Sequence, residues 1–152
     1  MPIRPMTETD LPKVLEIERV SFPCPWGEWA FRVELKPPGY AFVYELSGEV
    51  VGYAVVRIIR EEGHLLNIAV APERRRQGIG TELLRFCIDL CVKRGVKDIW
   101  LEVRESNLEA ISIYKKMGFI KVGTRRRYYQ DTGEDALIMR LRLKDDNAVE
   151  KR

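Results

Sequence analysis

Apolar residues follow two different periods along the chain, and each change of period marks a predicted helix or strand. Helical spacing occurs in four segments. A first helix, capped by Thr7 or Thr9, runs to residue 20, and the others cover residues 28–35, 78–93 and 108–117. Alternating or continuous apolar runs predict seven strands, at residues 3–5, 40–46, 50–60, 64–70, 98–103, 120–129 and 136–143.

The order of these elements, β-α-α-β-β-β-α-β-α-β-β, predicts the fold class. Such an alternation gives an α/β protein with a mixed central sheet of about seven strands and helices on both faces. No repeat or flexible linker interrupts residues 1–143, so we predict one domain there. Residues 144–152 are mostly charged and are predicted to form a frayed C-terminal tail.

Composition and charge narrow the class of protein. The 26 Lys and Arg residues against 23 Asp and Glu leave a net charge of +3, which argues against a strongly basic nucleic-acid-binding protein. No apolar run reaches the roughly 18–20 residues that span a membrane. Cys87 and Cys91 have helical spacing without a second pair nearby, so no metal site is predicted. We expect a cytoplasmic protein with reduced cysteines, Cys24 included.

The strongest chemical signal lies between residues 67 and 80. A predicted strand ends at Val70, a basic loop containing Arg74-Arg75-Arg76-Gln77 follows, and a long helix begins at Gly78. A helix N-terminus binds anions, and glycine lets a phosphate approach the backbone. The loop lacks the Gly-Lys-Ser/Thr ending of a Walker motif, and Leu83 stands where a dinucleotide motif has its third glycine. We therefore predict a diphosphate site without magnesium; the alternative is a tight turn with solvated arginines.

The segment Arg75-Arg76-Gln77-Gly78-Ile79-Gly80 resembles the acetyl-coenzyme A pyrophosphate loop of the GNAT acetyltransferases. Other segments resemble the RimI-type and archaeal Ard1-type protein N-terminal acetyltransferases. They are Asn67-Ile68-Ala69-Val70, Trp100-Leu101-Glu102-Val103-Arg104-Glu105-Ser106-Asn107, Ile113-Tyr114-Lys115-Lys116-Met117-Gly118-Phe119 and Arg126-Arg127-Tyr128-Tyr129. The resemblance spans about residues 1–143 and implies the GNAT fold, with acetyl-CoA as co-substrate and no metal.

The resemblance also implies which residues bind the cofactor. The backbone of one strand would pair with the pantetheine arm, and the loop and first helical turn would hold the diphosphate. These positions are Ile68, Ala69, Val70, Arg75, Arg76, Gln77, Gly78, Ile79, Gly80 and Thr81. Asn107 and Tyr114 would also contact the cofactor, although Asn107 is equally well explained as a helix N-cap.

Two residues are candidates for catalysis. In the predicted strand 98–103, Glu102 shares a face with Trp100, and the residues alone favour a solvent-facing glutamate slightly. The resemblance instead implies that Glu102 is the general base. Tyr114 lies on an apolar helical stripe, a pattern that indicates a core aromatic residue. A phenol can also protonate a thiolate, and the resemblance implies that role for Tyr114.

Aromatic residues in two predicted loops are candidates for binding the acceptor. The resemblance places Phe22, Pro23 and Trp26 on one side of the acceptor peptide's N-terminus. It places Tyr128 and Tyr129 on the other side, although both groups can also be read as hydrophobic plugs on the core. His64 is the only histidine, and the archaeal proteins also place a histidine there, so an auxiliary base is a further interpretation.

The predicted function is transfer of the acetyl group of acetyl-CoA to the N-terminal α-amine of a protein. The transfer is expected to be direct, in a ternary complex, with a ribosomal protein or a nascent chain as acceptor. No membrane partner is expected, and nucleic acid only indirectly through the ribosome. The alternatives are acetylation of lysine or a small amine, a non-catalytic coenzyme A-binding module, and an RNA-associated basic protein. The residue pattern identifies neither the acceptor nor its first residue.

Overall fold

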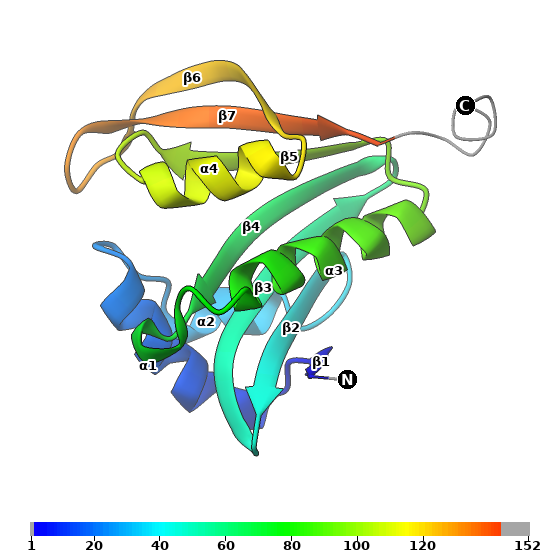
Figure 1. Ribbon diagram of the computed structural model, residues 1–152, viewed down its shortest axis with the longest axis vertical. Helices are drawn as coiled ribbons and strands as arrows, with labels where there is room; N and C mark the ends of the chain where they lie inside the picture. Colours follow the sequence, from blue (N-terminus) through cyan, green and yellow to red (C-terminus); the bar gives the residue numbers. More distant parts are fainter. Residues whose placement is uncertain (1, 144–152) are drawn as a thin grey trace. The chain divides into compact units, whose positions relative to one another are not determined.

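The computed structural model describes residues 2–143, which form alternating strands and helices (Figure 1). Within these residues, seven strands form one mixed sheet in the order β1-β2-β3-β4-β5-β7-β6. The strands are β1 (Ile3–Pro5), β2 (Gly39–Leu46), β3 (Glu49–Ile59), β4 (Glu62–Val70), β5 (Asp98–Arg104), β6 (Ile120–Tyr129) and β7 (Glu134–Arg142). The helices are α1 (Leu11–Ser21), α2 (Glu28–Val33), α3 (Ile79–Lys93) and α4 (Leu108–Lys116), with the 3₁₀ helices η1 (Glu8–Asp10) and η2 (Pro72–Arg74). The predicted α/β class with a mixed seven-stranded sheet is confirmed; the predicted tail, residues 144–152, lies outside the described residues.

A few element boundaries differ from the sequence prediction. Thr7 precedes η1 rather than α1, and its backbone N–H donates to the Asp10 carboxylate at 2.8 Å. The strand leading to the basic loop begins at Glu62 rather than His64, because its first residues pair with β5. The second helix ends at Val33, two residues earlier than expected.

Two compact units can be distinguished, and each is described by itself. The first comprises the described residues up to Ile58 together with Leu65–Cys87. Its core joins α1 and α2 to strands β2, β3 and β4. Burial of each large apolar side chain contributes about 1.5–3 kcal/mol. The buried residues of this core include Leu11, Val14, Ile17, Phe31, Val43, Tyr53, Val55 and Ala69.

The second unit comprises Ile59–His64 and the described residues from Ile88 onward. In it, β5 and β7 pair antiparallel along their lengths, β6 pairs with β7, and the first residues of β4 pair in parallel with β5. The side chains of β5 alternate: Ile99, Leu101 and Val103 are buried, whereas Trp100 and Glu102 are partly exposed. This alternation confirms the predicted orientation of the strand. No helix in the described part of the chain is both long and apolar enough to cross a membrane.

Candidate active site

The basic loop of the first unit joins β4 to α3, as predicted. Arg76 and Gly78 both have positive φ, 63° and 82°. Backbone N–H groups around residues of this conformation can form a concave anion-binding nest. The first helical hydrogen bond runs from the Glu82 N–H to the Gly78 carbonyl at 3.0 Å, so the N–H groups just before it have no partner within the helix.

Space is available beside this loop for a phosphate. A Cβ atom added to Gly78 would meet nothing within 4 Å. A Cβ atom on Gly80 would meet only Val70 Cγ2, at 3.6 Å. The backbone of the loop is therefore accessible at both glycines, and the 15-residue helix α3 begins directly behind it. This geometry fits an anionic ligand.

Arg75 has protein partners that the sequence did not predict. Its Nε donates to the carbonyl of Val70 at 3.1 Å, and its Nη2 donates to the hydroxyl of Ser21 at 3.2 Å. These two bonds connect the loop to the end of β4 and to the end of α1. Arg76 and Gln77 are exposed.

In the second unit, Glu102 and His64 form a close pair. His64 Nε2 lies 2.7 Å from Glu102 Oε1. The hydrogen bond from His64 lowers the pKa of Glu102, burial opposes that shift, and the nearby charges of His64 and Arg125 reinforce it. Glu102 is therefore an ionised carboxylate at neutral pH, with only 17% of its side chain exposed.

Tyr129 lies in the same environment and is held by Arg104. The guanidinium carbon of Arg104 lies 4.0 Å from the centroid of the Tyr129 ring. The same guanidinium is paired with Asp131 at 2.8 Å and with Glu134 at 3.5 Å. Burial raises the pKa of Tyr129 to about 12, with added repulsion from Tyr128, Glu102 and Glu134. The phenol is therefore neutral across the physiological range.

Strand β6 has an irregular backbone just before Tyr129, where its register with β7 shifts. Arg127 has a φ of 50°, and its N–H donates to the carboxylate of Asp135 at 2.9 Å. The rings of Tyr128 and Tyr129 meet edge to face at 5.1 Å, and the Arg125 guanidinium lies 4.8 Å above Tyr128. The structure thus brings the two predicted tyrosines together, and Tyr129 contacts Arg104 of β5.

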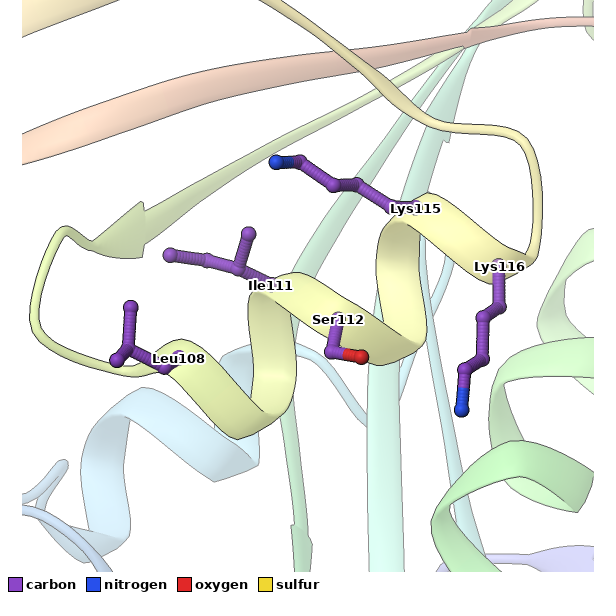
Figure 2. A pocket seen from close by; sticks show the side chains of 5 residues that line it. All are labelled: Leu108, Ile111, Ser112, Lys115 and Lys116. Carbon is purple, nitrogen blue, oxygen red and sulfur yellow. The ribbon is translucent and has the colours of Figure 1, made fainter.

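Helix α4 carries the other predicted residues of this unit. Asn107 is its N-cap, and its side-chain oxygen accepts the Ala110 N–H at 3.2 Å. Tyr114 is buried, and its ring lies 5.7 Å from that of Phe119. An open hollow lies along the helix, and Figure 2 shows that Lys115 and Lys116 point in different directions from it. The hollow is lined by Leu108, Ile111, Ser112, Lys115 and Lys116.

The predicted acceptor residues of the N-terminal loop belong to the first unit. Phe22 and Trp26 are partly buried against its core, and Pro23 is exposed. The Trp26 ring lies 5.1 Å from that of Phe31. Phe22 and Trp26 therefore belong partly to the core, in line with the alternative interpretation of these residues as a hydrophobic plug.

Sequence reasoning missed two well-anchored polar residues. Arg104 continues the alternation of Trp100 and Glu102, so the strand period could have placed it on the same face. Glu18 is a charged residue on the apolar stripe of α1, and its 1% exposure shows that the stripe buries it. A charge at a core-facing helical position was the available signal for Glu18.

The chain resembles known acetyltransferases in sequence and in structure. Residues 11–119 match the family described as Acetyltransferase (GNAT) family. The [ribosomal protein bS18]-alanine N-acetyltransferase of Escherichia coli (strain K12) is 40% identical over 141 residues, which cover 91% of this chain and 95% of that protein. The crystal structure of the ribosomal-protein-S18-alanine N-acetyltransferase from Escherichia coli has a TM-score of 0.87 at 38% identity, covering 95% of this chain and 96% of the other.

Two further solved structures are similar. Ard1 from Thermoplasma volcanium has a TM-score of 0.88 at 30% identity, covering 94% of this chain and 97% of the other. The NatC complex bound to Gag peptide and CoA contains a chain with a TM-score of 0.80 at 26% identity, covering 95% of this chain and 100% of the other. The complex that contains this structural neighbour is thus bound to CoA.

Proposed function

The chain belongs to the acetyltransferase (GNAT) family, and on that basis we propose that it transfers the acetyl group of acetyl-CoA to the N-terminal α-amine of a protein. The transfer is direct, within a ternary complex of enzyme, acetyl-CoA and acceptor. The observation that carries the proposal is the ionised Glu102 carboxylate, hydrogen-bonded to His64 beside Tyr129 and Arg125. Glu102 is therefore a weak base that lies near an aromatic and a cationic side chain. An α-amine can be acetylated with the help of such a weak base.

The basicity of the acceptor supports this choice of substrate. A protein α-amine has a pKa near ~8, against ~10.4 for lysine, so roughly a tenth of it is neutral at pH 7. A neutral amine attacks a carbonyl without prior deprotonation, and only the proton lost during the reaction must be removed. Glu102 accepts this proton, through a water molecule where the amine is out of direct reach. The lowered pKa of Glu102 suits that task better than removal of a proton from a lysine ammonium.

Acetyl-CoA supplies the acetyl group as a thioester. As the amine nitrogen bonds to the carbonyl carbon and the carbon–sulfur bond breaks, Glu102 takes the amine proton, and the Tyr114 hydroxyl gives its proton to the departing sulfur. A backbone N–H near Val70 stabilises the charge that develops on the carbonyl oxygen. Tyr114 then regains a proton from solvent, and Glu102 releases one.

The proposal assigns cofactor binding to residues of β4, of the basic loop and of the segment from Asn107 to Tyr114. The loop with Arg76 and Gly78 and the N-terminus of α3 bind the diphosphate through backbone N–H groups. The backbone of Ile68, Ala69 and Val70 pairs with the pantetheine arm. Asn107 and Tyr114 contact the same arm from α4. Arg75 acts mainly by fixing the loop, since its guanidinium already bonds to Val70 and Ser21.

The acceptor is a ribosomal protein or a nascent chain, and we place the activity in the cytoplasm. The bacterial relative is a ribosomal protein bS18-alanine N-acetyltransferase, which supports an acceptor that begins with a small residue. The residues assigned to the acceptor's N-terminus are Phe22, Pro23 and Trp26 of the segment between α1 and α2, and Tyr128 and Tyr129 at the end of β6. Rigid aromatic side chains at the acceptor's N-terminus favour a small first side chain.

A pair of peptides with one sequence tests the proposal. One peptide has a free N-terminus with an internal lysine, and the other has the same sequence with a blocked N-terminus. Release of coenzyme A and a mass increase of one acetyl group are expected with the free peptide alone. Acetylation of the blocked peptide would identify a lysine acetyltransferase. Binding of acetyl-CoA without turnover on an array of varied first and second residues would identify a non-catalytic coenzyme A-binding protein.

A further inference from the structure

Glu18 is a carboxylate buried inside the first unit, and its bonds come from three separate segments. Its side chain lies on α1 and only 1% of the residue is exposed. One carboxylate oxygen accepts the Tyr53 hydroxyl of β3 at 2.5 Å and the Asn67 side-chain amide of β4 at 2.9 Å. The other oxygen accepts the backbone N–H of Trp26 at 2.9 Å. Burial of a charge is costly, so full hydrogen bonding is what makes this position tenable.

The bond to Trp26 is the one that reaches an irregular segment. Residues 22–27 join α1 to α2 and contain Pro23 and Pro25, which have no backbone N–H (Figure 1). Such a segment has few backbone bonds of its own to fix its path. Glu18 supplies one from the interior, at Trp26, whose ring packs against Phe31.

The same turn of α1 is also connected to the basic loop. Ser21, three residues after Glu18, accepts the bond from Arg75 Nη2 at 3.2 Å. Asn67, which donates to Glu18, directly precedes Ile68 on β4. One turn of helix therefore sets both the path of residues 22–27 and their position relative to the strand that leads to the loop.

We propose that Glu18 is the positioning residue of the acceptor loop, residues 22–27. It touches neither acceptor nor cofactor; it fixes the backbone at Trp26 so that Phe22, Pro23 and Trp26 meet the acceptor peptide in one arrangement. This inference rests on the proposed function, in which these three residues bind the acceptor. It assigns to α1 a part in acceptor affinity and first-residue selectivity.

Replacement of Glu18 by glutamine is a sharp test because of the donors around it. Three donors converge on the two oxygens, and glutamine offers one oxygen and one NH₂ group. If the NH₂ group faces Trp26, two donors oppose each other and the loop is displaced. If it faces Tyr53 and Asn67, the glutamine oxygen still accepts the Trp26 N–H, but both of these side chains must reorient or lose their bonds, which disturbs the support of the loop. Neither orientation preserves all three bonds.

The experiment compares Glu18→Gln with the unmutated protein in steady-state acetylation of a peptide with a free N-terminus. A bond between a neutral donor and a buried carboxylate typically changes an equilibrium about tenfold or more. We therefore expect KM for the peptide to rise about tenfold, with kcat changed less than threefold. The acetyl-CoA affinity, measured by calorimetry, should stay unchanged. The ratio of kcat/KM between peptides with a small and with a bulky first residue should decrease. Glu16→Gln is the matched control: it removes one exposed charge from α1, where Glu16 faces Lys13 at 3.9 Å, and should change none of these values.

Amide hydrogen exchange gives a readout that does not depend on activity. Exchange over residues 22–27 should accelerate in Glu18→Gln, while exchange in α3 stays unchanged. Uniformly faster exchange would indicate a general loss of stability and would overturn the positioning role. If Glu18→Gln does not fold, Glu18→Asp keeps the charge but withdraws it from Trp26, and the same local acceleration and KM increase are expected. An unchanged peptide KM in both Glu18→Gln and Glu18→Asp, each still active, refutes this inference alone, whereas absence of acetylation by the unmutated protein refutes the proposed function.

Discussion

The imidazole of His64 and the carboxylate of Glu102 meet across the parallel pair β4 and β5, with 2.7 Å between Nε2 and Oε1. His64 pairs with Trp100 in the strand register, and Glu102 lies two residues further on the same face of β5. The bond keeps the carboxylate oriented and ionised. His64 is therefore the hydrogen-bond partner of Glu102, the proposed general base.

Replacement of Glu102 by glutamine should reduce kcat for peptide acetylation about 10²-fold or more, the usual contribution of a general base. Glutamine keeps the shape and can still bond to His64, so acetyl-CoA affinity and the melting temperature should change little. Single-turnover acetylation with a free N-terminal peptide measures the chemical step. A kcat within threefold of the unmutated protein would remove Glu102 from the reaction.

Replacement of His64 by alanine should raise the pKa of Glu102. In the folded protein the His64 bond holds this pKa below its ordinary value, and burial acts in the opposite direction. The stabilisation from the ionised carboxylate is therefore present above the pKa of the unfolded chain and is lost as the pH falls through the lower folded value. Without His64, burial dominates and the carboxylate protonates at a higher pH.

Carbon-13 NMR of labelled glutamate side chains measures that titration, and Glu102→Gln identifies the signal. His64→Gln is the matched control, because its amide can still donate a hydrogen bond to the carboxylate and should keep the pKa closer to that of the unmutated protein. An identical Glu102 titration in His64→Ala would contradict the assignment of the shift to this bond.

Replacement of Tyr114 by phenylalanine should lower kcat without weakening acetyl-CoA binding. The ring of Tyr114 packs near Phe119, and phenylalanine preserves that contact, so only the hydroxyl is lost. Loss of a general acid typically costs about 10²-fold or more. Stopped-flow detection of free thiol measures the effect. Tyr129→Phe is the comparison: it should raise the peptide KM rather than lower the rate of the chemical step.

The position of Glu102 could be predicted from sequence, but its partner could not. A period of two fixes which side chains of β5 share a face, and the burial of Ile99 and Leu101 follows from their apolar character. The contact with His64 depends on the register between two strands that are distant in the chain, and local periodicity does not determine register. The basic loop between β4 and α3 could be predicted more directly, because glycines and the start of a helix are local features of the sequence. The bonds of Arg75 to Ser21 and Val70 depend on the tertiary structure, and for that reason the sequence predicted only phosphate binding or solvent exposure for this arginine.

Replacement of Arg104 by methionine should release the β6–β7 hairpin around Tyr129. The guanidinium stacks on Tyr129 and pairs with Asp131 and Glu134, with 13% of its side chain exposed. Asp131 and Glu134 would lose their ion-pair partner and Tyr129 its stacking partner, so the melting temperature should fall. Arg104 also lowers the pKa of Tyr129, so ultraviolet titration should find that pKa higher in the variant. Arg126→Met, at an exposed position of the same hairpin, should change neither value.

The two glycines of the loop should respond differently to alanine. Gly78 has a φ of 82°, a conformation that costs an L-residue about 1–2 kcal/mol, so Gly78→Ala should lower the melting temperature and weaken acetyl-CoA binding together. Gly80 has no such constraint, and its added Cβ would make only an ordinary 3.6 Å contact with Val70, so Gly80→Ala should leave stability nearly unchanged. If the diphosphate lies against this backbone, the methyl group occupies part of its site, and acetyl-CoA affinity should still fall. Calorimetry and thermal unfolding of both variants separate the two effects. Unchanged acetyl-CoA affinity in Gly80→Ala would mean that the diphosphate does not lie on the Gly80 side of the helix N-terminus.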